Sequence, residues 1–229
     1  MNETNGTPAS TFTTFWIFRS VSMPEWSDNQ RRLAADNVAQ LVENNRNRVE
    51  LRAAYSTVGL TAGVDLILWF VADDISSFQA LAADMRRSPA GQALDAKFAY
   101  LGMATMSQYD PNHGPAFMRG LPPKQYLSVY PFTKTPAWYL LSFDERREMM
   151  KVHGQLGDEF PTILTNTVSS FGIADQEFVV ALEDDDPAIL IKMVQRLRAA
   201  EVREYTQVDT PIFLGLRKPL IDALRDALP

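Results

Sequence analysis

Residues 58–87, VGLTAGVDLILWFVADDISSFQALAADMRR, decide the fold, because their pattern occurs a second time in the chain. Residues 171–198, FGIADQEFVVALEDDDPAILIKMVQRLR, repeat the order of glycine turn, apolar strand, acidic cluster and amphipathic helix, with a gap in the turn. Recurrence of a whole strand–helix unit indicates a duplicated supersecondary motif. The sequence therefore predicts two similar halves.

Around the first copy, the sequence predicts the element order β-α-β-β-α-β. Aromatic and β-branched runs favour strands, and the expected strands cover residues 13–18, 49–58, 64–72 and 98–106. One helix is expected from Ser27 to about Glu43. A second is expected after the N-capping acidic pair at 73–74, ending near Arg87.

The second half repeats this order. Its expected strands cover residues 125–132, 163–171, 177–182 and 210–216. Helices are expected over residues 143–157 and from Pro187 to about Ala200. The run Asp184 to Asp186 resembles a Ca²⁺ or Mg²⁺ cluster, but N-capping of the following helix explains it better.

Each half thus matches the split β-α-β-β-α-β pattern of an α+β protein. Two such sheets can pack face to face or close into a barrel. We expect an N-terminal domain over residues 12–107, a linker over 108–124 and a C-terminal domain over 125–218. A linker of this length, rich in proline and glycine but carrying a histidine and an arginine, is typical of a pocket-lining loop.

Composition excludes several classes of protein. The 229 residues carry a net charge of −6 and no cysteine, which argues against nucleic-acid binding and excludes disulfides, thiolate-ligated haem and cysteine zinc sites. The longest apolar run, residues 66–72, is far shorter than the roughly 20 residues of a membrane span. Residues 1–11 lack the pattern of a signal peptide and indicate a flexible tail. We expect a soluble, cytoplasmic protein.

Only two histidines occur, His113 and His153. His153 falls in the helix expected over residues 143–157, where 3-4 spacing predicts one stripe formed by Arg146, Met149, Met150, His153 and Leu156. A neutral imidazole on a buried helix face is what an axial haem ligand requires. The alternative is a half-exposed helix histidine without a ligand.

Tyr130 and His113 are further candidates. Strand alternation places Tyr130 on one face with Tyr126 and Phe132, where a structural tyrosine is the alternative, since an ordinary pKa near 10 makes a poor base. His113 lies in a Pro/Gly loop, either facing solvent or acting as a mobile general base over a pocket. Candidate anion or ring contacts, each with a surface or core alternative, are Lys134, Trp138, Arg119 and Arg203.

Three segments carry a family resemblance: residues 130–154, YPFTKTPAWYLLSFDERREMMKVHG; residues 170–187, SFGIADQEFVVALEDDDP; and residues 209–213, DTPIF. With the order of elements, they resemble the chlorite dismutase-like superfamily, and within it the coproheme decarboxylase branch of the actinobacterial type. The resemblance implies that two ferredoxin-like halves form a dimeric α/β barrel within one subunit. It also implies porphyrin binding in the C-terminal half and a homopentamer.

The resemblance assigns roles to individual residues. His153 matches the axial iron ligand. Tyr130 matches a tyrosine that is oxidised and takes hydrogen from a propionate. Lys134 and Trp138 match positions that contact propionates, and His113 matches the distal histidine of the actinobacterial type. By a less secure alignment, Arg119 and Arg203 match further porphyrin contacts.

One departure separates the branches. Chlorite dismutases carry a distal arginine about a dozen residues after the axial histidine, whereas this chain has no arginine between Arg147 and Arg196 and reads TILTNT over residues 162–167. Without that cation, the resemblance disfavours chlorite dismutation. The same fold carries more than one activity, so the fold alone does not assign it.

The implied substrate is Fe-coproporphyrin III (coproheme), and the implied oxidant is hydrogen peroxide. Removal of CO₂ from two propionates would leave two vinyl groups and give haem b, the last step of coproporphyrin-dependent haem biosynthesis. Three alternatives stay open at this point: a chlorite dismutase or peroxidase on the same fold, a haem-binding protein without turnover, and an oligomeric scaffold that binds no porphyrin.

Overall fold

The computed structural model describes residues 10–21, 24–110 and 113–229. The tail expected over residues 1–11 lies outside the described residues except for Ser10 and Thr11. The first half contains β1 (Phe12–Ser20), α1 (Asp28–Asn45), β2 (Glu50–Ser56), β3 (Leu66–Ala72), α2 (Ile75–Arg87), α3 (Pro89–Ala93) and β4 (Leu94–Met103).

The rest of the chain begins with the short 3₁₀ turn η1. It contains η1 (Ala116–Arg119), β5 (Tyr126–Lys134), α4 (Pro136–Leu140), α5 (Phe143–Asp158), β6 (Leu164–Ser169), β7 (Phe178–Asp184), α6 (Pro187–Arg198), η2 (Glu201–Tyr205), β8 (Thr206–Val208), β9 (Phe213–Lys218) and α7 (Leu220–Ala227). The predicted α+β class and the duplicated order of elements are confirmed.

Local side-chain chemistry starts the helices. Ser27 and Ser142 each form a capping box at the start of α1 and α5. Asp74 accepts a hydrogen bond from the backbone N–H of Ser76, and Asp186 accepts one from that of Ala188. Among the described residues no His/Cys/Asp/Glu cluster that could hold a metal ion is found, and the N-cap interpretation of the acidic run before α6 is confirmed.

The strands form one continuous antiparallel system. The order within the first half is β4-β1-β3-β2, and within the second β6-β7-β5-β9. Pairing of β2 with β9 and of β4 with β6 joins the halves, while β5 pairs with β7. In the described part of the chain, these pairings return to their starting strand and close a ring of eight, with β8 attached beside β5.

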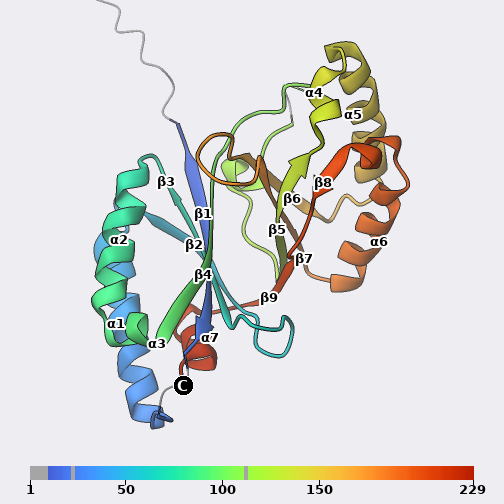
Figure 1. The fold of residues 1–229 in the computed structure, drawn as a ribbon. Helices are drawn as coiled ribbons and strands as arrows, with labels where there is room; N and C mark the ends of the chain where they lie inside the picture. The colour runs from blue at the N-terminus through green and yellow to red at the C-terminus, as the bar shows by residue number, and fades with distance from the viewer. Residues whose placement is uncertain (1–9, 22–23, 111–112) are drawn as a thin grey trace, which may run out of the picture.

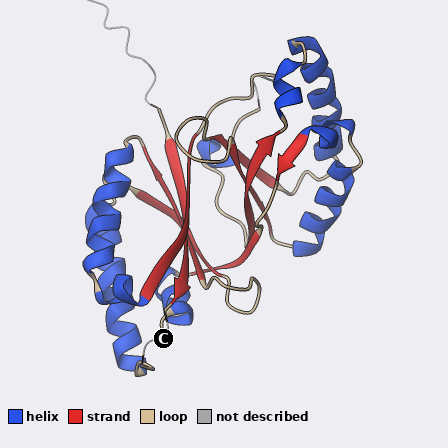
Figure 2. Ribbon diagram, viewed as in Figure 1, coloured by secondary structure: helices blue, strands red, loops and turns tan. Residues whose placement is uncertain are grey.

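Helices cover the outside of this ring. Figures 1 and 2 show α1, α2 and α3 along one side of the strands and α4, α5 and α6 along the opposite side. The ring interior holds an apolar core shared by both halves, to which Phe15, Trp69, Leu127, Val129 and Phe213 contribute. No helix of the described residues is long and apolar enough to span a membrane.

All predicted strands are present with shifted ends, and two of them, β4 and β9, begin well away from their predicted first residues. β4 begins at Leu94 rather than Phe98, because residues 94–96 pair with β1 beyond a bulge at Ile17/Phe18. β9 begins at Phe213 rather than Thr210, since Pro211 has no N–H to donate to a ladder.

The C-terminal helix α7 was not expected from the sequence. It packs against α1 and β2 of the first half, where Ala223, Leu224 and Ala227 are buried. The chain therefore returns to the N-terminal half after β9, and the predicted C-terminal domain of residues 125–218 ends before this crossing.

Candidate functional site

Helix α5 carries His153 and covers its side of the sheet only loosely. None of its residues is fully buried; the half-buried ones are Arg146, Met149, Met150, His153, Leu156 and Gly157. In the first half, by contrast, α2 buries Phe78, Leu81 and Met85. The stripe predicted from spacing is confirmed, and an apolar stripe that the chain leaves half covered is available to a ligand.

The His153 imidazole is a neutral base. Burial, together with the positive charges of Lys134 and His113, lowers its pKa to about 4. At neutral pH the ring therefore keeps a free nitrogen lone pair. Its Nδ1 is buried without a hydrogen-bond partner. These properties fit an iron ligand on a helix.

Lys134 places a cation in the same region. Its side chain is buried at the end of β5, and its Nζ lies 4.3 Å from the centre of the Trp138 ring and 5.3 Å from that of Phe132. Burial lowers the pKa of Lys134 to about 8, although Glu177 acts in the opposite direction. Within the described residues Lys134 forms no ion pair. A cation held in this way suits an anionic group of a ligand.

Trp138 is the centre of an aromatic cluster. It is buried on α4, with its ring 5.5 Å from that of Tyr205 and 6.5 Å from that of Tyr109. Tyr109 stacks on Phe143 at 5.7 Å. Met149, Met150 and Leu156 of α5 pack against the same cluster. The linker, α4, α5 and η2 therefore meet around one indole.

Tyr130 faces the helical side of the sheet. Its strand neighbours Leu127 and Val129 point into the ring core, whereas Tyr126 and Tyr130 pack against Ile163, Leu182, Leu190 and Met193. Burial and the negative charge of Asp209 raise the pKa of Tyr130 to about 12. The phenol therefore stays protonated at neutral pH and retains the hydrogen that an oxidant could remove.

Arg203 belongs to the surroundings of Tyr130. It pairs with Asp209 at 3.0 Å, and Arg198 pairs with the same oxygen at 2.8 Å. The charges of both arginines act on Tyr130, and that of Arg203 also acts on Lys134. The structure thus brings together His153, Lys134, Trp138, Tyr130 and Arg203.

His113 and Arg119 have different positions. His113 is exposed on the linker, but its charge reaches His153 and lowers the pKa of that residue. Arg119 is exposed at the end of η1, and no hydrogen bond or ion pair in the described part of the chain links it to the other site residues. The structure brings His113 close to the site and does not connect Arg119 to it.

Sequence reasoning missed several residues of the site. Tyr109, Glu177, Arg198 and Asp209 were not singled out, and Tyr109 OH, Arg146 Nε and Gln176 Nε2 are buried without hydrogen-bond partners. Glu177 accepts hydrogen bonds from the Lys134 N–H and the Tyr139 hydroxyl. Glu177, Gln176 and Asp209 all lie within segments that carry the family resemblance, but only tertiary structure joins Asp209 to Arg198.

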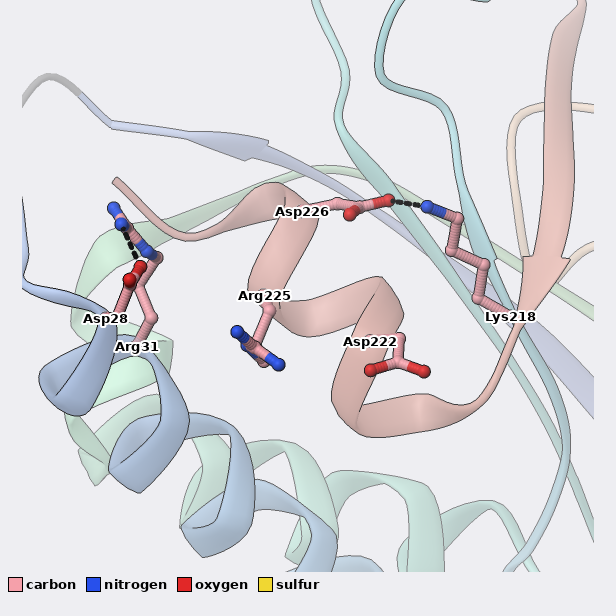
Figure 3. Close-up of a pocket in the computed structure, with 6 residues that line it drawn as sticks. All are labelled: Asp28, Arg31, Lys218, Asp222, Arg225 and Asp226. Carbon is pink, nitrogen blue, oxygen red and sulfur yellow. Dashed lines mark hydrogen bonds and ion pairs between the residues drawn. The ribbon is translucent and has the colours of Figure 1, made fainter.

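Two cavities lie away from these residues. One of about 690 Å³ lies beside α1 and α7 (Figure 3) and is lined by Asp28, Arg31, Lys218, Asp222, Arg225 and Asp226. Four of these charged side chains neutralise one another, because Asp28 pairs with Arg31 and Lys218 pairs with Asp226. A second cavity of about 180 Å³ lies near Arg52 and Phe117. Neither includes His153 or Tyr130.

Comparison with known proteins places the chain in a family. The sequence profile described as chlorite dismutase matches residues 31–218, so the chain belongs to the chlorite dismutase family. A relative named coproheme decarboxylase, from Mycolicibacterium smegmatis, is 32% identical over 184 residues, which is 80% of each chain. Another of that name, from Staphylococcus saprophyticus, is 26% identical over 175 residues, 69% of this chain and 70% of that one.

Solved structures show the same fold. A chlorite dismutase from Candidatus Nitrospira defluvii in complex with imidazole matches 95% of each chain with a TM-score of 0.84 and 21% identity. A mutant chlorite dismutase from the same organism matches 96% of each chain with a TM-score of 0.86 and 20% identity. The predicted chlorite dismutase-like fold is confirmed, while identities this low carry no assignment of activity.

Proposed function

We propose that this protein is a coproheme decarboxylase. It would remove the carboxyl groups of two propionates of Fe-coproporphyrin III, with hydrogen peroxide as oxidant, and release haem b. The observation that carries the proposal is the half-covered stripe of α5, on which a neutral His153 lies within electrostatic reach of the buried cation Lys134. The relatives named coproheme decarboxylase support the choice of reaction.

The residues present fit an iron porphyrin. His153 would bind the iron, and the apolar side chains of Trp138, Met149 and Met150 suit the faces of a macrocycle. Lys134 and Arg203 would hold carboxylates by charge-assisted hydrogen bonds. We also propose Arg119 as a carboxylate contact, on the strength of the family resemblance. The C-terminal half would then hold the substrate.

The iron porphyrin, once bound, would supply the redox chemistry. Tyr130, buried and protonated, would give up its hydrogen and then take one from the propionate β-carbon. His113 would accept a proton from peroxide and return it to the departing oxygen. Each propionate would lose one CO₂ and two hydrogens, and each peroxide would leave as two waters. The second propionate must then reach the same tyrosine, which requires the porphyrin to turn in its site.

Chlorite dismutation is less well supported. Asn166, within the segment 162–167, is buried among interior groups and bonds to Glu183 rather than facing α5. The flanking arginines are engaged on the surface, since Arg147 pairs with Asp144 and Arg196 with Glu159. A fixed cation for chlorite would therefore have to come from elsewhere.

We further propose that the protein works in the cytoplasm, and that it assembles into a homopentamer, as the family resemblance implies. Analytical ultracentrifugation of the purified chain would give the assembly mass directly. A monomer or dimer at micromolar concentration would contradict the pentamer.

The decisive experiment loads the apoprotein with ferric coproheme, adds hydrogen peroxide stepwise and follows porphyrin mass. We expect two successive losses, each of one CO₂ plus two hydrogens. A porphyrin that stays unchanged or is only bleached would contradict the proposal. Oxygen release on addition of chlorite would then assign the chain to chlorite dismutation.

A further inference from the structure

A buried carboxylate joins the two halves of the ring. Glu183 of β7 is completely buried and accepts three hydrogen bonds. Arg52 Nη2 and Asn166 Nδ2 donate to its Oε2 at 2.8 and 3.2 Å, and the Tyr55 hydroxyl donates to its Oε1 at 2.9 Å. Burial and the charge of Glu183 raise the pKa of Tyr55 well above its ordinary value, so its hydroxyl remains a donor.

Two of these three partners also bind the linker of residues 108–124. The side-chain oxygen of Asn166 accepts the backbone N–H of Phe117 at 2.8 Å. Arg52 Nη1 donates to the carbonyl oxygen of Leu121 at 2.9 Å. One carboxylate therefore orients the two side chains that fasten the linker at points four residues apart.

The fastened segment fits into the ring core. Pro115, Ala116 and Phe117 are buried, and the Phe117 ring meets that of Trp69 edge-on at 5.9 Å. The Arg52 guanidinium lies over the Trp69 ring, 4.6 Å from its centre. His113 lies only four residues before Phe117. The two hydrogen bonds that fasten the linker, at Phe117 and Leu121, therefore restrict the positions that the His113 side chain can take.

Stability alone does not account for this network. A buried ion pair contributes little net stability, because desolvation of both charges offsets their attraction. Apolar residues of similar volume in its place often give a protein that is equally stable. Polar groups retained in such a core gain a role when they specify one arrangement of the chain. Here the specified arrangement is the path of the linker.

We propose that Asn166 and Arg52, oriented by Glu183, are positioning residues that hold the linker so that His113 faces the site on α5. The proposal rests on the proposed role of His113 in the peroxide reaction. The peroxide reaction would then depend on three further residues, Asn166, Arg52 and Glu183. None of the three lies on the helical side of the sheet.

A matched pair of variants separates positioning from stability. Asn166→Ala removes one hydrogen bond to Glu183 together with the bond to Phe117. Tyr55→Phe also removes one hydrogen bond to Glu183, from the same core, but leaves the linker untouched. Arg52→Lys is a second test, because a lysine can keep the charge opposite Glu183 but cannot also reach the Leu121 carbonyl in the same geometry.

The first readout needs no porphyrin. With two histidines in the chain, the ¹H NMR spectrum contains two imidazole Cε1–H signals, and His113→Ala identifies the one from His113. We expect Asn166→Ala to shift or broaden the His113 signal, and Tyr55→Phe to leave it in place. If circular dichroism shows that Asn166→Ala does not fold, Arg52→Lys takes its place, and we expect that variant to shift or broaden the His113 signal.

The second readout is the rate of reaction of the coproheme-loaded protein with peroxide. A positioned general base contributes roughly 10²–10⁴-fold, so Asn166→Ala should slow the reaction about tenfold or more, and Tyr55→Phe less than about twofold. Combined with His113→Ala, Asn166→Ala should cause no further loss.

The outcomes are distinct. Equal effects of Asn166→Ala and Tyr55→Phe on the His113 signal and on the rate would overturn the positioning role. If Asn166→Ala displaces the His113 signal but His113→Ala leaves the rate unchanged, the linker anchor stands and the proposed role of His113 fails. Fully additive rate losses in the double variant would also overturn the inference.

Discussion

The ammonium group of Lys134 lies 4.3 Å from the centre of the Trp138 ring. Lys134 ends β5 and Trp138 lies on α4, which begins at Pro136 directly after that strand. The tight strand–helix junction thus brings a cation onto an aromatic face in a buried environment. Such a cation is held in place before any carboxylate arrives.

Lys134→Met should weaken binding of coproheme by about 10- to 100-fold. A charge-assisted hydrogen bond contributes about 1.5–3 kcal/mol, which is the energy of that change in Kd. Quenching of tryptophan fluorescence by the porphyrin measures the affinity. The control is Lys151→Met, because Lys151 is exposed on the outer face of α5 and pairs with Glu148. Equal losses in both variants would remove Lys134 from the site.

Lys134 should also make stability depend on pH. Burial lowers its pKa from 10.5 to about 8 in the folded protein, so between these values the unfolded chain holds more protons. Stability therefore rises with pH across this window, by up to about 3 kcal/mol at 1.36 kcal/mol per pH unit. Urea unfolding of the apoprotein at pH 7.5 and pH 10 should show this rise relative to Lys134→Met. A constant difference between the two proteins would contradict the burial of a charged amine.

His153→Ala should weaken binding of ferric coproheme and change its visible spectrum, because the imidazole is the proposed iron ligand. Metal-free coproporphyrin has no iron to coordinate, so its affinity should change by less than about threefold, or about 0.6 kcal/mol. Absorption titrations with both porphyrins make the comparison. An unaltered ferric spectrum would move the ligand to another residue.

Tyr130→Phe should bind coproheme normally but fail to decarboxylate it. The substitution keeps the aromatic ring that packs against the cluster of Ile163, Leu182, Leu190 and Met193, so it should leave the fold intact. Mass spectrometry of the porphyrin after peroxide addition is the measurement. Tyr126→Phe, on the same strand face, is the control. Two full CO₂ losses in the Tyr130 variant would remove this residue from the mechanism.

Leu224→Ala should destabilise the protein by about 2–5 kcal/mol, the range for truncating a fully buried leucine. Leu224 lies on the buried face of α7 and is 0% exposed, while Leu33 of α1 is 55% exposed and serves as the comparison. Denaturant unfolding should show a large loss for Leu224→Ala and a small one for Leu33→Ala. Similar losses would mean that α7 is not packed on the first half.

Periodicity and local chemistry made most of the fold predictable. The repeated pattern in residues 58–87 and 171–198 gave both βα units, and the capping residues Ser27, Asp74 and Asp186 marked helix starts correctly. These signals are local, since a cap or an alternation involves residues a few positions apart. Helix α7 was missed because it is short and is stabilised by packing against distant α1.

The candidate site likewise combines features that the sequence predicts with features that depend on tertiary structure. Helical spacing predicted that Arg146, Met149 and His153 share a stripe, and the structure confirms this. No local sequence pattern predicts the ion pairs of Arg198 and Arg203 with Asp209. The position of Arg119, outside the cluster of other site residues, was equally unpredictable, because it depends on the path of the linker.

By itself the sequence determined the duplicated α+β order, the helix starts and the stripe that carries His153, because short-range hydrogen bonding and hydrophobic periodicity specify them. Tertiary structure alone decided that the strands close into a ring and that Glu183 fastens the linker through Asn166 and Arg52. It also decided that Lys134, Tyr130 and Arg203 surround one region. A contact such as that between Arg52 and Glu183, which are 131 positions apart, depends on how the two halves pack, and no local pattern encodes that packing.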